Sequence, residues 1–195
     1  TDASELSWGG HRCDPRTEPE RLTVAEAFQR HAGVDLFATV GHAEKLARAG
    51  GIAMHDGDTW DDVFFRIMFD RIEGRLGMGR PTILCEYPIG MAALARAKPG
   101  DPRVAERFEL YVCGVELANA FGELTDPDIQ RARLAADMDE KERLYGARWP
   151  VDEDFLAALD HGLPDCAGVA LGFDRLVMLA TGAAHIEDVL WLPVR

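Results

Sequence analysis

Apolar residues recur at three- and four-residue spacing through the first part of the chain, which is typical of amphipathic helices. The clearest stripe runs from Thr59 to Leu76 and predicts one helix over that range. Two shorter helices are predicted over 23–31, where Thr23 and Glu26 have capping-box spacing, and over 42–49, before two glycines. Residues 1–20 have Gly, Pro and polar punctuation without a period, and are predicted to be irregular.

The pattern changes to strand-like runs after residue 80. A strand is predicted over 80–88, and two more within 103–121 that meet at a tight turn formed by Cys113 and Gly114. Further along, the sequence predicts a long helix from the Asp126 cap to Tyr145, a helix over 155–159, a strand over 167–171, a helix over 173–179 and a final strand over 189–194.

Helices followed by a hairpin, more helices and returning strands predict an α+β domain, with a mostly antiparallel sheet flanked by helices. The 195 residues are enough for one domain with a real core and hardly enough for two. We therefore expect a single domain over 1–195, with a mainly helical first region over 1–80 and a sheet core over 81–195.

Composition narrows the class of protein. With 21 Lys and Arg against 34 Asp and Glu, the formal charge is −13, which argues against a dedicated nucleic-acid module but leaves room for a local phosphate pocket. No apolar run approaches the ~20 residues that span a membrane, and no signal peptide is visible. The four cysteines form no C-x-x-C pair, so we expect reduced thiols in a cytoplasmic protein. Histidine ligand spacings, glycine-rich phosphate loops and G-x-S-x-G are also missing.

The segment ERFELYVCGVELANAFGELTD, residues 106–126, carries most of the candidate chemistry. Burying a carboxylate on a strand is costly unless a cation, a metal or a ligand amine pairs with it. Glu116 stands among apolar neighbours and is therefore the most probable inward-facing acid of the segment. Strict alternation would place Asn119 and Glu123 on the opposite face, so one shared pocket would require a bulge in between.

A second segment, CAGVALGFDRLVML at residues 166–179, runs from an apolar strand through Gly172 into Asp174 and Arg175. A glycine there lets a flat ligand approach the backbone, and the arginine suits a phosphate or an adenine ring. A capping aspartate with a structural salt bridge explains the same two residues equally well. The local sequence leaves both interpretations open.

Together these segments resemble a known family. GVALGFDRLVML resembles motif 3 of the class II aminoacyl-tRNA synthetases, and the 106–126 segment is similar to the lysine-type strand pair that precedes it. DPRVAERFELY, GVELANAF and ELTD resemble the branch of the lysyl-tRNA synthetase family that attaches lysine to elongation factor P. The similarity covers residues 20–195 and implies part of a class II catalytic domain.

The resemblance implies an ATP-dependent ligase that makes lysyl-adenylate and passes the lysyl group to an acceptor. It makes Glu116 and Arg175 catalytic, with Glu116 holding Mg–ATP and with Leu117, Gly172 and Arg175 also binding ATP. The amino-acid site it implies consists of Asn119, Glu123 and Ala170, with Glu123 facing the ammonium group. The implied partners are lysine or β-lysine and elongation factor P, or tRNA as the alternative acceptor.

The chain also departs from the family pattern. Asn119 is followed by alanine where the family has glycine, and YPIGMAALA, residues 87–95, lacks the usual serine. Motifs 1 and 2 are absent, so the resemblance implies only a C-terminal part of the catalytic domain, inactive alone, whose homodimer would need motif 1. Ala170 favours the elongation factor P branch, because lysyl-tRNA synthetases usually have glycine there. A fragment of a true lysyl-tRNA synthetase and a non-catalytic binding module remain the alternatives.

Overall fold

The computed structural model describes residues 4–192. The chain forms two compact units. Unit 1 contains the residues up to Tyr87, the segment Phe108–Ala120 and the residues from Val169 onward, and unit 2 contains Pro88–Arg107 and Phe121–Gly168. Within residues 4–192, no helix combines the length and the apolarity needed to cross a bilayer.

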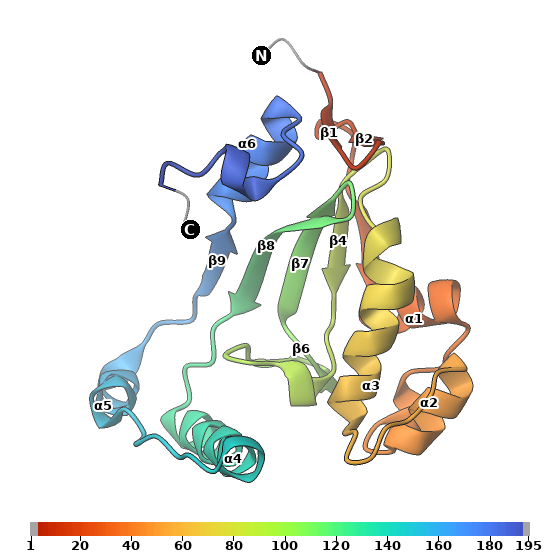
Figure 1. Ribbon diagram of the computed structural model, residues 1–195. Coiled ribbons are helices and arrows are strands. Elements are labelled where there is room, and N and C mark those ends of the chain that lie inside the picture. The colour runs from red at the N-terminus through yellow and green to blue at the C-terminus, as the bar shows by residue number, and fades with distance from the viewer. Residues whose placement is uncertain (1–3, 193–195) are drawn as a thin grey trace. The chain divides into compact units, whose positions relative to one another are not determined.

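A five-stranded sheet organises unit 1 (Figure 1). Its order is β3-β4-β7-β8-β9, formed by β3 (Glu20–Thr23), β4 (Thr82–Cys85), β7 (Arg107–Val112), β8 (Val115–Gly122) and β9 (Ala167–Leu171). Strand β4 pairs antiparallel with β7 but parallel with β3. The parallel pair is possible because the chain between β3 and β4 crosses over through helices. The predicted α+β class with a mostly antiparallel sheet is confirmed.

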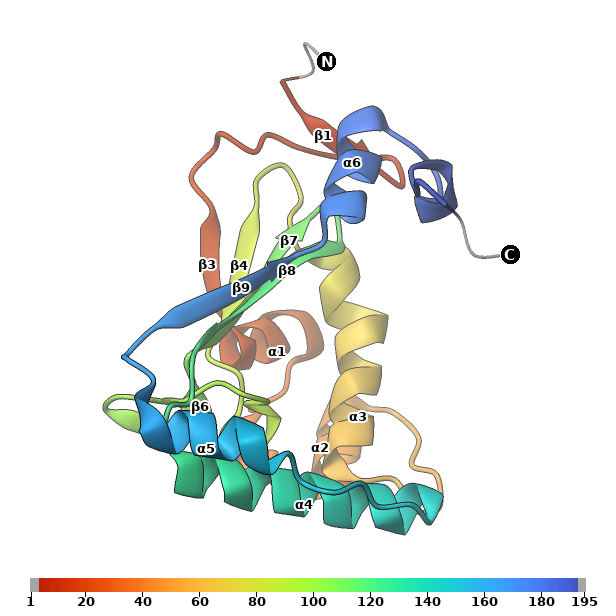
Figure 2. The ribbon, with the colours of Figure 1, turned by 90° about the vertical axis from the view of Figure 1, so that its left-hand side faces the viewer.

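Three helices connect β3 to β4: α1 (Val24–Ala32), α2 (Ala43–Gly50) and α3 (Trp60–Ile67). Figure 2 shows α1 and α3 on the same side of the sheet. The capping box at Thr23 and Glu26 is present as predicted, and Gly33 and Gly51 end α1 and α2 in the left-handed conformation. Phe28 of α1 stacks on Phe64 of α3, with ring centroids 4.7 Å apart.

The prediction of one regular helix over 59–76 is wrong in its second half. After α3 the chain continues as a π-helical turn, Met68–Ile72, and then as a 3₁₀ turn, Glu73–Arg75. The widened turn rotates the side chains that follow it relative to an ideal α-helix, and such π segments are frequent at functional sites. Apolar spacing alone does not distinguish these helix types.

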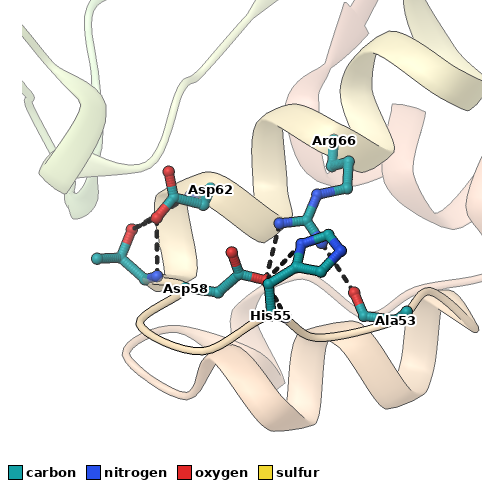
Figure 3. Close-up of polar contacts among 6 residues, drawn as sticks. Ala53, His55, Asp58, Asp62 and Arg66 are labelled. Carbon is teal, nitrogen blue, oxygen red and sulfur yellow. Dashed lines mark hydrogen bonds and ion pairs between the residues drawn. The ribbon is translucent and has the colours of Figure 1, made fainter.

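The turn that leads into α3 is held by a polar cluster (Figure 3). The Asp58 carboxylate accepts hydrogen bonds from the backbone N–H of His55 at 2.7 Å and from Arg66 at 2.8 Å. Arg66 also donates to the Ala53 carbonyl at 2.8 Å. One arginine therefore ties the turn to the helix that follows it.

The expectations for the two ends of the chain are wrong where the structure describes them. Residues 1–20 are not all irregular, because β1 (Leu6–Trp8) and β2 (His11–Cys13) form an antiparallel hairpin. The strand expected over 189–194 is absent from 189–192, which are irregular after a short 3₁₀ turn, Ile186–Asp188; residues 193 and 194 lie outside the described residues.

Helix α6 (Phe173–Thr181) packs beside β1 in unit 1 (Figure 1). Five buried residues form the core cluster on that side: Cys13, Val112, Cys113, Leu117 and Leu179. All four cysteines of the chain are unbridged thiols. Burial, the largest cause, raises the pKa of Cys13 to about 11 and raises that of Cys113 as well. The β7–β8 turn is tight as predicted, with Cys113 and Gly114 at φ values of 52° and 75°.

Unit 2 contains a two-stranded sheet of β5 (Ala97–Lys98) and β6 (Asp101–Ala105) and the helices α4 (Pro127–Tyr145) and α5 (Glu153–Gly162). Helix α4 begins at the Asp126 cap and ends at Gly146, as predicted. The two helices lie side by side, and Arg131 pairs with Glu153 at 2.6 Å (Figure 2). The expected pair of strands within 103–121 is in fact β6, β7 and most of β8.

Candidate functional site

The junction of β9 with α6 is attached to β8 at the residues singled out from the sequence. The N–H of Gly172 donates to the Leu117 carbonyl at 2.8 Å. One step into α6, Nη1 of Arg175 donates to the Glu116 carbonyl at 2.8 Å and lies 3.4 Å from the Glu116 carboxylate. Four of the seven predicted site residues are therefore linked by direct contacts within unit 1.

The geometry bears on both interpretations of Arg175, as a partner in a structural salt bridge and as a ligand-binding residue. The salt bridge that the structural interpretation requires is present, since Arg175 and Glu116 form an ion pair. The Arg175 and Glu116 side chains remain 46% and 36% exposed, so neither is committed to the core. A half-exposed ion pair contributes little to stability, whereas an exposed guanidinium remains able to bind a ligand.

A cavity of about 680 Å³ opens beside this pair, entirely within unit 1. The cavity is large enough for a nucleotide-sized ligand. Its wall contains Glu73, Glu109, Glu116 and Glu187 together with Arg175, and therefore carries more negative than positive charge. Aromatic side chains from α3 and its continuation complete the wall, among them Phe65 and Phe69, which are 45% and 65% exposed.

Two acidic residues behind Glu116 were not assigned to the site from the sequence. Glu109 of β7 is only 7% exposed and accepts a 2.7 Å hydrogen bond from the hydroxyl of Tyr111. The same hydroxyl lies 3.4 Å from Glu73. Burial, followed by the charge of Glu109, raises the pKa of the Glu73 carboxyl above its usual value, and burial likewise raises the pKa of Tyr111.

The remaining predicted site residues are spread over both units. Asn119 is half-buried on β8 in unit 1, and Ala170 is exposed on β9 in the same unit. Glu123 follows β8 and belongs to unit 2. The cavity wall includes Glu116 and Arg175 and does not include Glu123. The expected convergence of Glu123 with these two residues stays a prediction.

The acids were also considered as metal ligands. Residues 4–192 contain no group of three or more His, Cys, Asp or Glu side chains that could hold a metal ion by themselves. Magnesium does not need such a group, because it commonly takes one or two carboxylates and completes its shell with phosphate oxygens and water. Glu116 and Glu109, which share the cavity wall, fit that requirement.

Glu106, the other acid of the 106–126 segment, has a structural partner. Its carboxylate accepts a hydrogen bond from Nε of Arg96, which also contacts Asp165. All three residues belong to unit 2, whereas Glu109 and Glu116 belong to unit 1. The acids of the segment are therefore divided between the two units.

Known proteins were compared with the chain. Residues 9–195 match the family model described as tRNA synthetases class II (D, K and N). Curated relatives include proteins named elongation factor P–(R)-beta-lysine ligase from Klebsiella pneumoniae subsp. pneumoniae, 41% identical over 181 residues, and from Vibrio cholerae serotype O1, 42% identical over 180 residues. These matches cover 91% and 89% of the chain and 55% of each relative.

The chain thus spans about half the length of the curated relatives it matches. The family model matches residues 9–195, which include β7 and β8, the β9–α6 junction and parts of both units. It also agrees with the mostly antiparallel sheet, whose strand β8 carries Glu116. This protein belongs to the class II tRNA synthetase family of types D, K and N.

Proposed function

We propose that the protein is an ATP-dependent ligase that activates lysine or β-lysine and transfers it to elongation factor P. The observation that carries the proposal is the Arg175–Glu116 pair on the wall of a nucleotide-sized cavity. The names of the curated relatives supply the substrate and the acceptor. The chemistry is two transfers: the lysine carboxylate attacks the α-phosphorus and releases pyrophosphate, and the acceptor amine then attacks the acyl carbon and releases AMP.

Each residue of the site has a distinct part in this proposal. Arg175 binds the nucleotide, through a phosphate or by stacking on the adenine, and Gly172 lies against the ring. Glu116 and Glu109 would hold Mg²⁺, which neutralises phosphate charge when bound. The resemblance assigns Asn119, Glu123 and Ala170 to the amino acid, with Glu123 facing its ammonium group. Catalysis of this kind depends mainly on positioning and charge stabilisation.

The negative charge of the cavity wall predicts that nucleotide binding requires a divalent cation. Four glutamates and one arginine repel a bare triphosphate, so ATP should bind only with a divalent cation. Calorimetric titration of the protein with ATP, with and without Mg²⁺, tests whether ATP binding requires the cation. We expect Arg175→Ala to weaken Mg–ATP binding about 10- to 100-fold, the loss typical of one hydrogen bond to a charged group. We expect Glu116→Gln to weaken the dependence on Mg²⁺.

The matched control is Arg143→Ala, which removes an arginine that pairs with Glu140 within α4. Unchanged Mg–ATP binding in both site variants would contradict a nucleotide site in this cavity. Loss of binding in the control as well would show that the effect is not local.

A true lysyl-tRNA synthetase is a second candidate, favoured by the family model, which describes tRNA synthetases. Offering both acceptors with labelled lysine or β-lysine to the chain joined to a segment that carries motifs 1 and 2 separates the two functions. Label on elongation factor P supports the proposal, and label on tRNA alone supports the second candidate. In that longer protein, nucleotide binding without adenylate or transfer would indicate a binding module.

A further inference from the structure

The backbone around Glu123 is fixed from two sides within unit 2. The Glu123 N–H donates to the Cys166 carbonyl at 3.0 Å, and the next N–H, of Leu124, donates to the Leu94 carbonyl at 2.9 Å. Glu123 also forms a β-bridge with Ala95. With its backbone held in this way, the position of the Glu123 carboxylate depends on the space around its side chain.

That space is provided by Gly168 of β9. A Cβ atom built on Gly168 would lie 2.4 Å from Oε1 of Glu123 and 3.6 Å from its Cδ. Non-bonded atoms do not approach to 2.4 Å, so any side chain at position 168 must displace the carboxylate. The Glu123 oxygen therefore lies directly over the α-carbon of Gly168.

The backbone itself does not require glycine at this position. Gly168 is not among the glycines with positive φ, so an alanine could adopt its conformation without strain. The overlap involves only the far end of a flexible side chain, which can rotate away at small cost. Glycine at position 168 is therefore explained by the carboxylate and not by the fold.

The Glu123 carboxylate is also available to a ligand. Among the described residues, no hydrogen bond or ion pair engages its oxygens, although the nearby Arg96 binds both Glu106 and Asp165. The side chain is only half-buried. An unpaired, half-buried carboxylate suits a cationic group such as an ammonium.

We infer that Gly168 is a positioning residue, which keeps the Glu123 carboxylate in the orientation that receives the ammonium group of the amino-acid substrate. This inference rests on the proposed function, which gives Glu123 that ligand. Gly168 itself contributes no polar group to the substrate. Its part is to leave empty the volume that the carboxylate occupies.

Gly168→Ala tests the inference, with Gly90→Ala as the matched control. Gly90 is also in unit 2, also lacks a positive φ, and a Cβ there would meet nothing within 4 Å. Three measurements are made on each variant: the melting temperature, the crystal structure, and the affinities for lysine, β-lysine and Mg–ATP. Glu123→Gln is measured beside them.

We expect Gly168→Ala to rotate the Glu123 side chain and to weaken binding of the amino acid about 10- to 100-fold, as Glu123→Gln does. The affinity for Mg–ATP and the melting temperature should stay at wild-type values, because only a flexible side chain moves and alanine restricts the unfolded chain. A merely structural role of Gly168 would lower the melting temperature instead. Gly90→Ala should change none of these quantities.

The outcomes separate the inference from the proposed function. An unmoved Glu123 side chain in the Gly168→Ala structure, or a large fall in melting temperature, would overturn the positioning role. Weakened binding in Glu123→Gln but not in Gly168→Ala would overturn it as well. Wild-type binding in Glu123→Gln, or no binding of lysine and β-lysine to the wild type, would instead remove the substrate assigned to Glu123, and the structure of Gly168→Ala would still decide whether Gly168 holds the carboxylate.

Discussion

The resemblance implies that a single methyl group at position 170 distinguishes the two branches of the family. Ala170 is exposed on β9, where its side chain is able to meet a ligand. One methylene in a binding pocket typically changes discrimination by about 1–3 kcal/mol. We expect Ala170→Gly to shift the ratio of the binding affinities from β-lysine toward lysine by about tenfold or more.

The control for this prediction is Ala167→Gly, which makes the same change at another exposed position of β9. Competition between the two labelled amino acids gives the ratio directly. A ratio that is identical in the wild type and Ala170→Gly would exclude residue 170 from the amino-acid site.

Glu73 gives a prediction about stability and pH. Its pKa is raised above the ordinary 4.5, mainly by burial and then by Glu109, so the folded state binds its proton more tightly than the unfolded state does. The favourable contribution of the protonated carboxyl is complete below pH 4.5 and is lost as the pH rises through the higher folded pKa. We expect Glu73→Gln to be more stable than the wild type at pH 8.

Urea denaturation between pH 4 and pH 8 measures this difference. The difference in the free energy of unfolding between Glu73→Gln and the wild type should shrink as the pH falls toward about 4.5. Glu18→Gln, at an exposed glutamate of the same unit, is the matched control. If this difference in the free energy of unfolding is constant with pH, glutamate and glutamine at position 73 differ in packing and not in charge.

At the scale of single residues, the resemblance singled out Glu116 and Arg175 through its two segments, and the structure shows these two residues in contact. The sequence did not assign Glu73 or Glu109 to the cavity. Glu109 was visible as an acid on a strand, but its burial depends on Tyr111 and on the chain beyond α3. Such burial is decided by tertiary packing, which apolar spacing along one strand does not contain.

Among the elements, caps and glycine stops were the most reliable signals. The boundaries of α1, α2 and α4 follow them closely. The β1–β2 hairpin was missed because each strand has three residues, too few to show alternation. The two glycines between these strands are a hairpin signal that could have located it.

The turn before α3 is the element whose stability depends most plainly on one carboxylate. The pKa of Asp58 is lowered, first by the backbone N–H of His55 and then by Arg66. Its contribution to stability is therefore present above the ordinary pKa of 3.8 and is lost as the pH falls through the lower folded pKa. We expect Asp58→Asn to lower the melting temperature at pH 7 and to increase amide exchange over residues 53–58.

Asp56→Asn, at an exposed aspartate of the same turn, is the comparison. As the pH falls through the lowered folded pKa of Asp58, the wild type and Asp58→Asn should approach the same melting temperature, because the carboxylate becomes protonated in both states of the wild type. Equal amide exchange in the two aspartate variants at pH 7 would refute the anchoring role.

At the scale of the whole molecule, the prediction concerns which steps, nucleotide binding or adenylate formation, the 195 residues can perform by themselves. Arg175 is the only arginine in the cavity wall that the structure describes, and the resemblance implies that motif 2, absent here, would contribute further to catalysis. Removing one preorganised donor typically costs on the order of 10²–10³ in rate. We expect the purified chain to bind Mg–ATP yet to show no useful lysine-dependent pyrophosphate exchange.

Exchange by the purified 195-residue chain at the level of the curated relatives would refute that expectation. Heat-inactivated chain and reactions without lysine provide the background for the assay. An exchange signal that persists without lysine would identify a contaminating activity and not the chain.

The burial of Cys13 and Cys113 has a practical consequence for following the amino-acid site in solution. Their raised pKa values leave little thiolate at neutral pH, and the thiolate is the form that attacks alkylating reagents. Cys166 is partly exposed, and its carbonyl already accepts the N–H of Glu123. With Cys85 replaced by serine, a thiol-reactive fluorophore would attach at Cys166, one hydrogen bond from Glu123, and its emission would report lysine binding without any mutation in the site.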